Sequence, residues 1–188
     1  MLKFLIVGLG NPGDQYLNTR HNIGFKALDH VEKQANAFFV SDKYGSVCNF
    51  KYKGKQVYLL KPNTFMNLSG TAVRYWMDKE KIIKDNILVV TDDLNLPLAT
   101  LRLKKKGSDG GHNGLKNIQE KLNSNVYPRL RIGVGNDFSK GKQVDYVLGD
   151  WSAEELVVIE DKIETIKEMI LGFCFNGLNN TMNTYNNK

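Results

Sequence analysis

Two stretches of the chain carry side chains that could perform acid–base chemistry on a carbonyl group. Asn11 and His21 lie in a polar, glycine-rich stretch that follows the first apolar run, and Asp92 directly follows another apolar run. A neutral histidine beside a carboxylate is the usual arrangement of a general base, since the carboxylate fixes the tautomer and stabilises the imidazolium. An asparagine amide can donate a hydrogen bond to a carbonyl oxygen on which negative charge develops. These residue types favour a water molecule that is activated by histidine and attacks a carbonyl.

Further polar side chains lie in two other loops. Asn67 belongs to a polar segment at 61–70, and His112 and Asn113 belong to a glycine-rich segment at 107–114. We expect all these loops to meet if the sheet is mainly parallel, because the carboxyl ends of parallel strands share one edge. Lone histidines and asparagines also cap helices and hold turns, so the residue types leave that use open. For His112 we expect a role in shaping its loop rather than a contact with a substrate.

Other kinds of reaction centre find less support in the sequence. There is no G-x-S-x-G motif, and neither Cys48 nor Cys174 has a basic neighbour that would activate a thiolate. The three histidines lack the spacing of a metal site, so we expect no metal. Two widely separated cysteines are typical of reduced thiols in a cytosolic protein.

The spacing Gly8-x-Gly10-x-x-Gly13 also satisfies the dinucleotide-binding fingerprint and supports an alternative, a nucleotide-dependent oxidoreductase. That fingerprint needs an acidic residue at the end of the next strand, about 20 residues on. Asp29 and Glu32 instead fall within a predicted helix. The sequence therefore disfavours this alternative.

Apolar runs and turn residues predict the elements that position the loops. The strands are expected at 4–7, 38–41, 46–52, 56–61, 87–90, 101–103 and 130–134. The helices are expected at 22–36, at 71–79 with Ser69 as a cap, at 115–122, and beyond a Ser152–Glu155 capping box. This alternation predicts a single three-layer α/β domain with a mixed, mostly parallel sheet and helices on both faces.

The length and net charge of the chain indicate the number of domains and the kind of partner. The 188 residues suffice for one domain, which we expect at 1–178, followed by a polar, frayed tail at 179–188. A net charge of +6 favours an anionic partner, with nucleic acid ahead of an acidic membrane surface. The first apolar run is too short for a signal peptide and no run could span a bilayer, so we expect a cytoplasmic protein without a membrane partner.

Six blocks, in order along nearly the whole chain, carry a resemblance to a known family. They are VGLGNPGDQYLNTRHNIG, KPNTFMNLSG, DDLNLP, GSDGGHNGLKNI, RLRIGVG and DYVLGDWS. The sequence closely resembles the bacterial-type peptidyl-tRNA hydrolases, which cleave the ester between a peptide and the 3′ ribose of tRNA and so return the tRNA to translation. The resemblance implies one mixed-sheet α/β domain that acts as a monomer without metal, cofactor or obligate protein partner.

The resemblance also implies roles for matching positions in the reaction. His21 would be the base that takes a proton from water, and Asp92 would stabilise its basic form. Asn11 would contact the peptide and discriminate blocked from free aminoacyl-tRNA. Asn67 and Asn113 would bind the 3′ CCA end and the reacting ester.

Four further positions match the tRNA-binding cleft of the family. Tyr16 and Phe65 would line the cleft, where the terminal adenine could stack. Lys104 and Arg131 would grip phosphate of the acceptor stem.

The chain departs from the family at Ala99, commonly glycine, and at Asn95, commonly aspartate, which affects local turns rather than the reaction. A non-catalytic RNA-binding protein would also explain the basic triplet at 104–106, but it leaves His21 and Asp92 without a task.

Overall fold

The first apolar run of the sequence forms β1, the central strand of a seven-stranded sheet in the computed structural model, which describes residues 1–186. The strand order is β2-β3-β4-β1-β5-β7-β6. β1 pairs in parallel with β4 and β5, and β5 pairs in parallel with β7. The strand bounds are β1 Lys3–Gly8, β2 Val40–Asp42, β3 Gly45–Tyr52, β4 Lys55–Pro62, β5 Ile87–Asp93, β6 Leu101–Lys106 and β7 Val126–Gly133.

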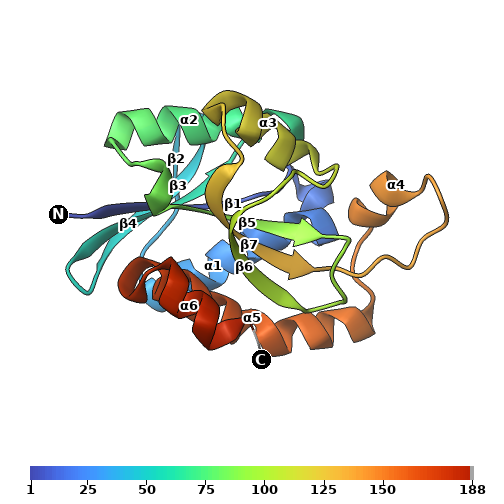
Figure 1. Cartoon of the computed structure of the whole chain (residues 1–188). Coiled ribbons are helices and arrows are strands. Elements are labelled where there is room, and N and C mark those ends of the chain that lie inside the picture. The colour runs from blue at the N-terminus through green and yellow to red at the C-terminus, as the bar shows by residue number, and fades with distance from the viewer. Residues whose placement is uncertain (187–188) are drawn as a thin grey trace.

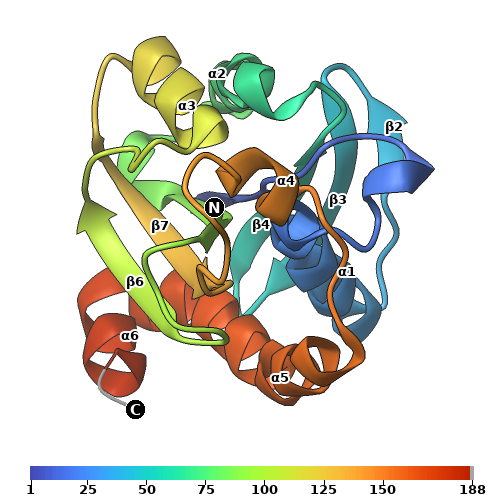
Figure 2. The same ribbon diagram turned by 90° about the vertical axis from the view of Figure 1, so that its right-hand side faces the viewer.

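Helices cover both faces of this sheet, as the alternation of elements predicts (Figure 1). α2 and α3 lie on one face, and α1, α5 and α6 lie on the other. The short helix α4 lies in front of the strand ends, between these two layers (Figure 2). The bounds are α1 Ile23–Ala35, α2 Ser69–Glu80, α3 Asn113–Leu122, α4 Gln143–Val147, α5 Ala153–Asn176 and α6 Leu178–Tyr185. Four single-turn helices are η1 Asp14–Tyr16, η2 Arg20–Asn22, η3 Met66–Leu68 and η4 Lys84–Asn86.

The predicted mixed sheet with helices on both faces is confirmed, and its parallel pairings occupy the centre. Antiparallel pairings join β2 to β3, β3 to β4 and β6 to β7 at the two edges. Hairpins explain the pairings of β2 with β3 and of β3 with β4, since short turns connect neighbouring strands only in the antiparallel sense. Between β6 and β7 the chain instead passes through α3. The carboxyl ends of β1, β5 and β7 therefore point to one edge.

The protein has two apolar cores, one on each face of the sheet, and alternate side chains of the central strand β1 belong to each of them. Phe4 and Ile6 of β1 pack into the core beneath α1 and α5, while Leu5 and Val7 pack into the core beneath α2 and α3. Successive side chains of a strand point to opposite faces, so a strand covered on both faces is apolar throughout.

Two local predictions are wrong and one is confirmed. Ser69 does not cap α2 but is its first residue, and its hydroxyl donates to the carbonyl of Met66 at 2.7 Å. The basic triplet does not follow a strand; it forms the second half of β6. The predicted capping box of Ser152 and Glu155 opens α5.

The region expected to be a frayed tail is helical as far as Tyr185, and its last two residues, 187–188, lie outside the described part of the chain. Leu178 and Met182 pack against the core beneath α5, which stabilises α6. The side chain of Asn186 accepts a hydrogen bond from the Leu103 amide and donates one to the Leu103 carbonyl, each at 2.8 Å. The segment is therefore ordered despite its polar composition, because these apolar and backbone contacts hold it against the rest of the domain.

The start of α1 approaches the end of β1 so closely that a glycine is required at position 24. A Cβ atom there would lie 2.4 Å from the Leu9 amide nitrogen and 2.6 Å from the Val90 carbonyl oxygen. We expect Gly24→Ala to lower the free energy of unfolding by at least about 2 kcal/mol, because backbone atoms cannot yield. This loss outweighs the roughly 1 kcal/mol by which alanine favours a helix. Urea denaturation checks the prediction.

Gly172 of α5 provides the matched control for this prediction. A Cβ atom at Gly172 would meet only side-chain atoms, of Thr181 at 3.2 Å and of Asn176 at 3.9 Å. Gly172→Ala should therefore change the stability by less than about 1 kcal/mol. Equal effects at the two glycines would contradict the steric explanation.

Candidate active site

The polar loops meet at the carboxyl edge of the sheet, around a cavity of about 720 Å³. The walls come from the loop after β1, from the end of β5, from η2, η3 and α4, from the loop before α3, and from one face of the β6–β7 pair. Eight of the nine residues that the sequence singles out line this cavity: Asn11, His21, Phe65, Asn67, Asp92, Lys104, Asn113 and Arg131. The ninth, Tyr16, lies half-buried in η1 and is not among the lining residues.

A carboxylate held between two histidines forms the floor of the cavity. The Oδ2 atom of Asp92 lies 2.9 Å from Nδ1 of His21, and its Oδ1 atom lies 2.9 Å from Nε2 of His112. Asp92 is 3% exposed and His21 is 9% exposed. The close approach of Gly24 to the end of β1 brings η2, which carries His21, to the end of β5, where Asp92 lies.

The hydrogen bonds assign different tautomers to the two histidines. Nδ1 of His112 accepts from the amides of Gly114 and Leu115 at 3.1 and 3.3 Å, so its proton lies on Nε2 and is donated to Asp92. The hydroxyl of Thr91 also accepts from this nitrogen at 2.9 Å and donates to the Asp92 carbonyl. His21 donates from Nδ1, which leaves its Nε2 as a lone-pair acceptor. His21 is therefore the histidine that can take a proton.

The electrostatics keep the carboxylate ionised and favour a protonatable base. Burial opposes the charge on Asp92, but the two histidines outweigh it and hold the pKa of this carboxyl well below its usual range. Burial likewise lowers the pKa of His21, and attraction to Asp92 together with their hydrogen bond raises it above the ordinary value of 6.5. The raised pKa makes the neutral ring of His21 a stronger base than an isolated histidine.

Asn11 is held rigidly, with only its amide NH₂ group free to act. Its backbone amide donates to Oδ1 of Asn22 at 2.8 Å, and its carbonyl accepts from Nδ2 of Asn22 at 2.9 Å. Its side-chain Oδ1 accepts from the Met66 amide at 2.8 Å. Because an amide N–H can only donate, the orientation of the Asn11 side chain is fixed and its Nδ2 is a donor beside His21.

The remaining lining residues divide into an exposed polar rim and a basic wall. Asn67 of η3, Asn113 at the start of α3 and the ring of Phe65 are exposed in the cavity. The basic wall consists of cations on one face of the β6–β7 pair, where Lys104 lies opposite Arg129 in the register. Arg131, half-buried on the same face, forms an ion pair with Asp93.

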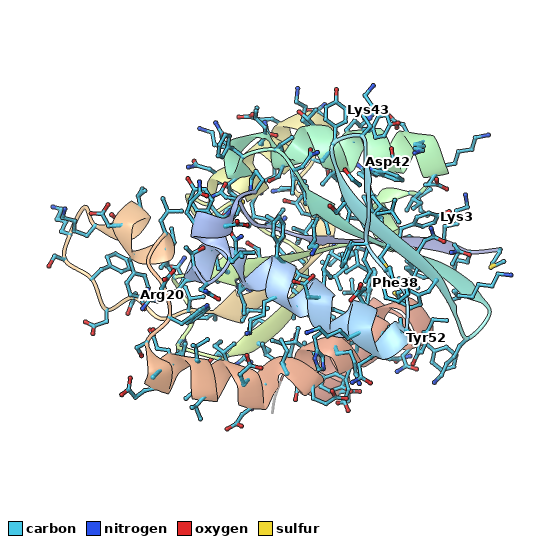
Figure 3. The ribbon with its side chains drawn as sticks, turned by 180° about the vertical axis from the view of Figure 1, so that it is seen from behind. Lys3, Arg20, Phe38, Asp42, Lys43 and Tyr52 are labelled. Carbon is cyan, nitrogen blue, oxygen red and sulfur yellow. The ribbon has the colours of Figure 1, made fainter. Side chains whose placement is uncertain are left out.

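α4 lines one side of the cavity, and Arg20 of η2, labelled in Figure 3, bonds both α4 and the start of α5. The guanidinium of Arg20 bonds Glu155 at 2.6 Å and the Tyr146 carbonyl at 3.1 Å, and lies 4.3 Å from the centre of the Tyr146 ring. Arg20 immediately precedes His21 in η2. The sequence pattern missed α4 because it follows a polar stretch and has only five residues.

His21, Asp92 and His112 form the one group in residues 1–186 whose donor atoms could hold a metal, since these atoms lie within 4.8 Å of one another. Both histidine nitrogens that face Asp92 already donate protons to it. A metal ion would have to displace both protons, so the arrangement fits a hydrogen-bonded relay better than a ligand set. Across the same residues, no helix combines the length and apolarity needed to cross a membrane.

Comparison with known proteins gives consistent similarities along the whole chain. The sequence model described as peptidyl-tRNA hydrolase matches residues 5–188. A peptidyl-tRNA hydrolase of Phocaeicola vulgatus is 53% identical over 187 residues, covering 100% of each chain, and one of Parabacteroides distasonis is 51% identical with the same coverage. The crystal structure of peptidyl-tRNA hydrolase from Acinetobacter baumannii superposes with a TM-score of 0.92 at 33% identity, covering 97% of this chain and 94% of that one.

The environment of His21 predicts how its titration depends on Asp92. We expect the pKa of His21 to fall from above 6.5 in the wild type to below 6.5 in Asp92→Asn, because burial remains while the charge of the carboxylate is lost. NMR titration of the histidine ring signals measures this change, and the signals of His30, on the outer part of α1, provide the internal control. A His21 pKa that is the same in both proteins would contradict this electrostatic account.

Proposed function

This chain belongs to the bacterial peptidyl-tRNA hydrolase family, and on that basis we propose how its own residues divide the work of the reaction. The protein is a carboxylic ester hydrolase that cleaves peptidyl-tRNA and releases tRNA for translation. The sequence prediction of this function from its motif blocks is confirmed. The assignments of individual residues that follow are proposals.

His21 is the general base. Its Nδ1–H bond to Asp92 leaves Nε2 as the lone-pair nitrogen in the cavity, and this single observation carries the assignment. Nε2 removes a proton from a water molecule as the water oxygen bonds to the ester carbonyl carbon. The resulting imidazolium is stabilised by Asp92, which stays ionised throughout.

Collapse of the tetrahedral intermediate completes the reaction. The carbonyl re-forms, the bond to the 3′ oxygen of the ribose breaks, and the imidazolium of His21 returns the proton to that oxygen. The products are tRNA with a free 3′ hydroxyl and a peptide carboxylic acid, which releases its proton to solvent and becomes a carboxylate. The fixed Nδ2 of Asn11 supplies a hydrogen-bond donor to the carbonyl groups of the substrate, which supports its role in selecting blocked aminoacyl groups.

The rim and the basic wall receive the tRNA. Asn67 and Asn113 bind the 3′ end and the ester, and the exposed ring of Phe65 provides a surface on which the terminal adenine stacks. Lys104 and Arg131 contact phosphate of the acceptor stem. Tyr16 lies outside the lining residues, so for Tyr16 we propose contact with tRNA beyond the cavity.

The enzyme works as a cytoplasmic monomer in this proposal. Each role above is assigned to a residue of one chain, and the substrate is produced where translation takes place. Sedimentation of the active enzyme at one chain per particle tests the monomeric state.

The first experiment measures acyl release from N-acetylated and from free aminoacyl-tRNA with EDTA present. We expect the wild type to cleave only the blocked substrate, and His21→Ala to lower kcat by about 10²–10⁴, the usual contribution of a general base. His30→Ala is the matched control, since His30 of α1 contacts Glu164 of α5 and lies outside the lining residues. A near-normal kcat in His21→Ala would remove His21 from the role, and binding without any cleavage by the folded wild type would favour the RNA-binding alternative.

The basic wall predicts a salt-dependent KM. Replacing Lys104 or Arg131 by alanine should mainly raise KM and reduce the slope of log(kcat/KM) against log[salt] by about one, because each phosphate contact releases counterions. Lys79→Ala is the control, since Lys79 pairs with Asp42 away from the cavity. A salt slope equal to that of the wild type in both variants would exclude these residues from the tRNA surface.

A further inference from the structure

Arg129 of β7 is the largest fully buried side chain among the described residues, with 1% of its surface exposed. It nevertheless carries a cation at the wall of the cavity. Burying a charge is costly unless the charge is paired, and none of the carboxylates in residues 1–186 forms an ion pair with this guanidinium. Burial lowers the pKa of Arg129, which reflects the same cost. Arg129 belongs to the basic wall, but the phosphate contacts proposed above are assigned to Lys104 and Arg131, and Arg129 has no role of its own there.

The contacts of Arg129 join two segments of backbone. Its Nη1 donates to the carbonyl of Ser108 at 3.0 Å, and its Nη2 donates to the carbonyl of Asn125 at 3.1 Å. Its Nε is buried without a partner in the described structure, and the guanidinium lies 4.3 Å from the centre of the Tyr127 ring. The planar fork of arginine suits such a two-armed contact, whereas lysine offers only a point charge.

The segment that Arg129 holds is the glycine-rich loop at 107–112. Gly110 and Gly111 adopt φ values of 60° and 83°, a region that is open to glycine, so the loop has little intrinsic rigidity. On one side of these glycines the loop is held by Arg129 and by Gln119, whose Nε2 donates to the Gly107 carbonyl at 3.2 Å. On the other side it continues into His112 and α3.

His112 connects this loop to the reaction centre. It caps α3 through Nδ1 and donates to Asp92 through Nε2, so its ring has no freedom that is independent of the loop. A shift of the loop would therefore lengthen the bond from His112 to Asp92. The charge of the carboxylate would then be shared with His21 alone.

We propose that Arg129 is a positioning residue for the hydrolysis: it fixes the 107–112 loop so that His112 donates to Asp92 and sets the basicity of His21. The inference rests on the proposed role of His21 and goes beyond it by assigning a task to a buried residue outside the reaction centre. Arg129 itself touches neither the reacting atoms nor Asp92.

The test compares Arg129→Lys, Arg129→Met and His112→Ala with the wild type, using kcat and its pH dependence. We expect both Arg129 variants to lower kcat by about tenfold to a hundredfold, the usual cost of misplacing a catalytic group. KM should change less. The acid limb of the pH profile should move to higher pH in all three variants, because a carboxylate that lacks one donor stabilises the His21 imidazolium more strongly.

The route of the effect is tested by a double-mutant comparison. If Arg129 acts through His112, Arg129→Lys should lower kcat far less in the His112→Ala background than in the wild type. Tyr127→Phe is the matched control, since it keeps the ring beneath the guanidinium and changes neither Arg129 nor the two carbonyl groups that Arg129 contacts; its pH profile should be that of the wild type. The other charged groups that line the cavity remain unchanged in all these variants: Asp93, Lys104, Lys106, Asp109 and Arg131.

Several outcomes would overturn the proposal. Folded Arg129→Lys with a normal kcat and pH profile would do so, and so would a loss of kcat that is fully additive with His112→Ala. If Arg129→Met does not fold, Gln119→Ala replaces it in the test, because Gln119 holds the same loop from a partly exposed position. Gln119→Ala should also move the acid limb of the pH profile to higher pH. An unshifted acid limb would count against the proposal. Failure of the His21 assignment is a separate result, since it is read from the activity of His21→Ala alone.

Discussion

A single buried carboxylate imposes the main constraint on this structure. Asp92 is ionised in an environment that opposes its charge, and two histidine N–H groups compensate for that cost. These donors come from positions 71 and 20 residues away in the chain, so the ends of β1 and β5 and the loop before α3 must converge. The glycine contacts between β1 and α1, and the backbone contacts of the 107–112 loop, serve that convergence. Stability and chemistry depend on the same hydrogen bonds, since an unpaired buried carboxylate would destabilise the fold.

His21 and His112 show how two residues of the same type acquire different properties from their hydrogen bonds. Each donates one proton to Asp92, and the difference lies in the opposite ring nitrogen. In His112 that nitrogen is occupied by two backbone amides of α3, while in His21 it lies in the cavity. A ring nitrogen that accepts structural hydrogen bonds is a poor base, because protonation would break them. Helix capping thus fixes the tautomer of His112, while the second ring nitrogen of His21 stays available to accept the proton in the proposed reaction.

The sequence predicts the convergence of loops better than it predicts the contacts within them. Continuous apolar runs identify the buried strands, and the parallel-sheet rule places Asn11, His21 and Asp92 at one edge. The α6 helix was missed because its stability comes from packing against α5 and from contacts with β6, neither of which is encoded locally. Arg129 and Arg131 are two residues apart in β7 and so lie on the same face of the strand, yet Arg129 is fully buried and Arg131 is partly exposed. Arg129 is buried because the 107–112 loop folds against it, and a pattern of charges along the strand does not predict that contact.

The distribution of charge around the cavity allows a site that contains a buried carboxylate to accept a polyanionic substrate. An exposed carboxylate near the ester would repel the phosphates of tRNA, but each acidic residue that lines the cavity has a local partner. Asp92 is bonded by two histidines, Asp93 by Arg131, and Asp109 by the backbone amide of Gly111. The cations of Lys104 and Lys106 remain exposed at the wall. Charges in the open cavity act over roughly a Debye length of 8–10 Å, so the approaching tRNA meets the positive charge of these lysines. The charge of the buried Asp92 carboxylate is compensated by its two histidine partners.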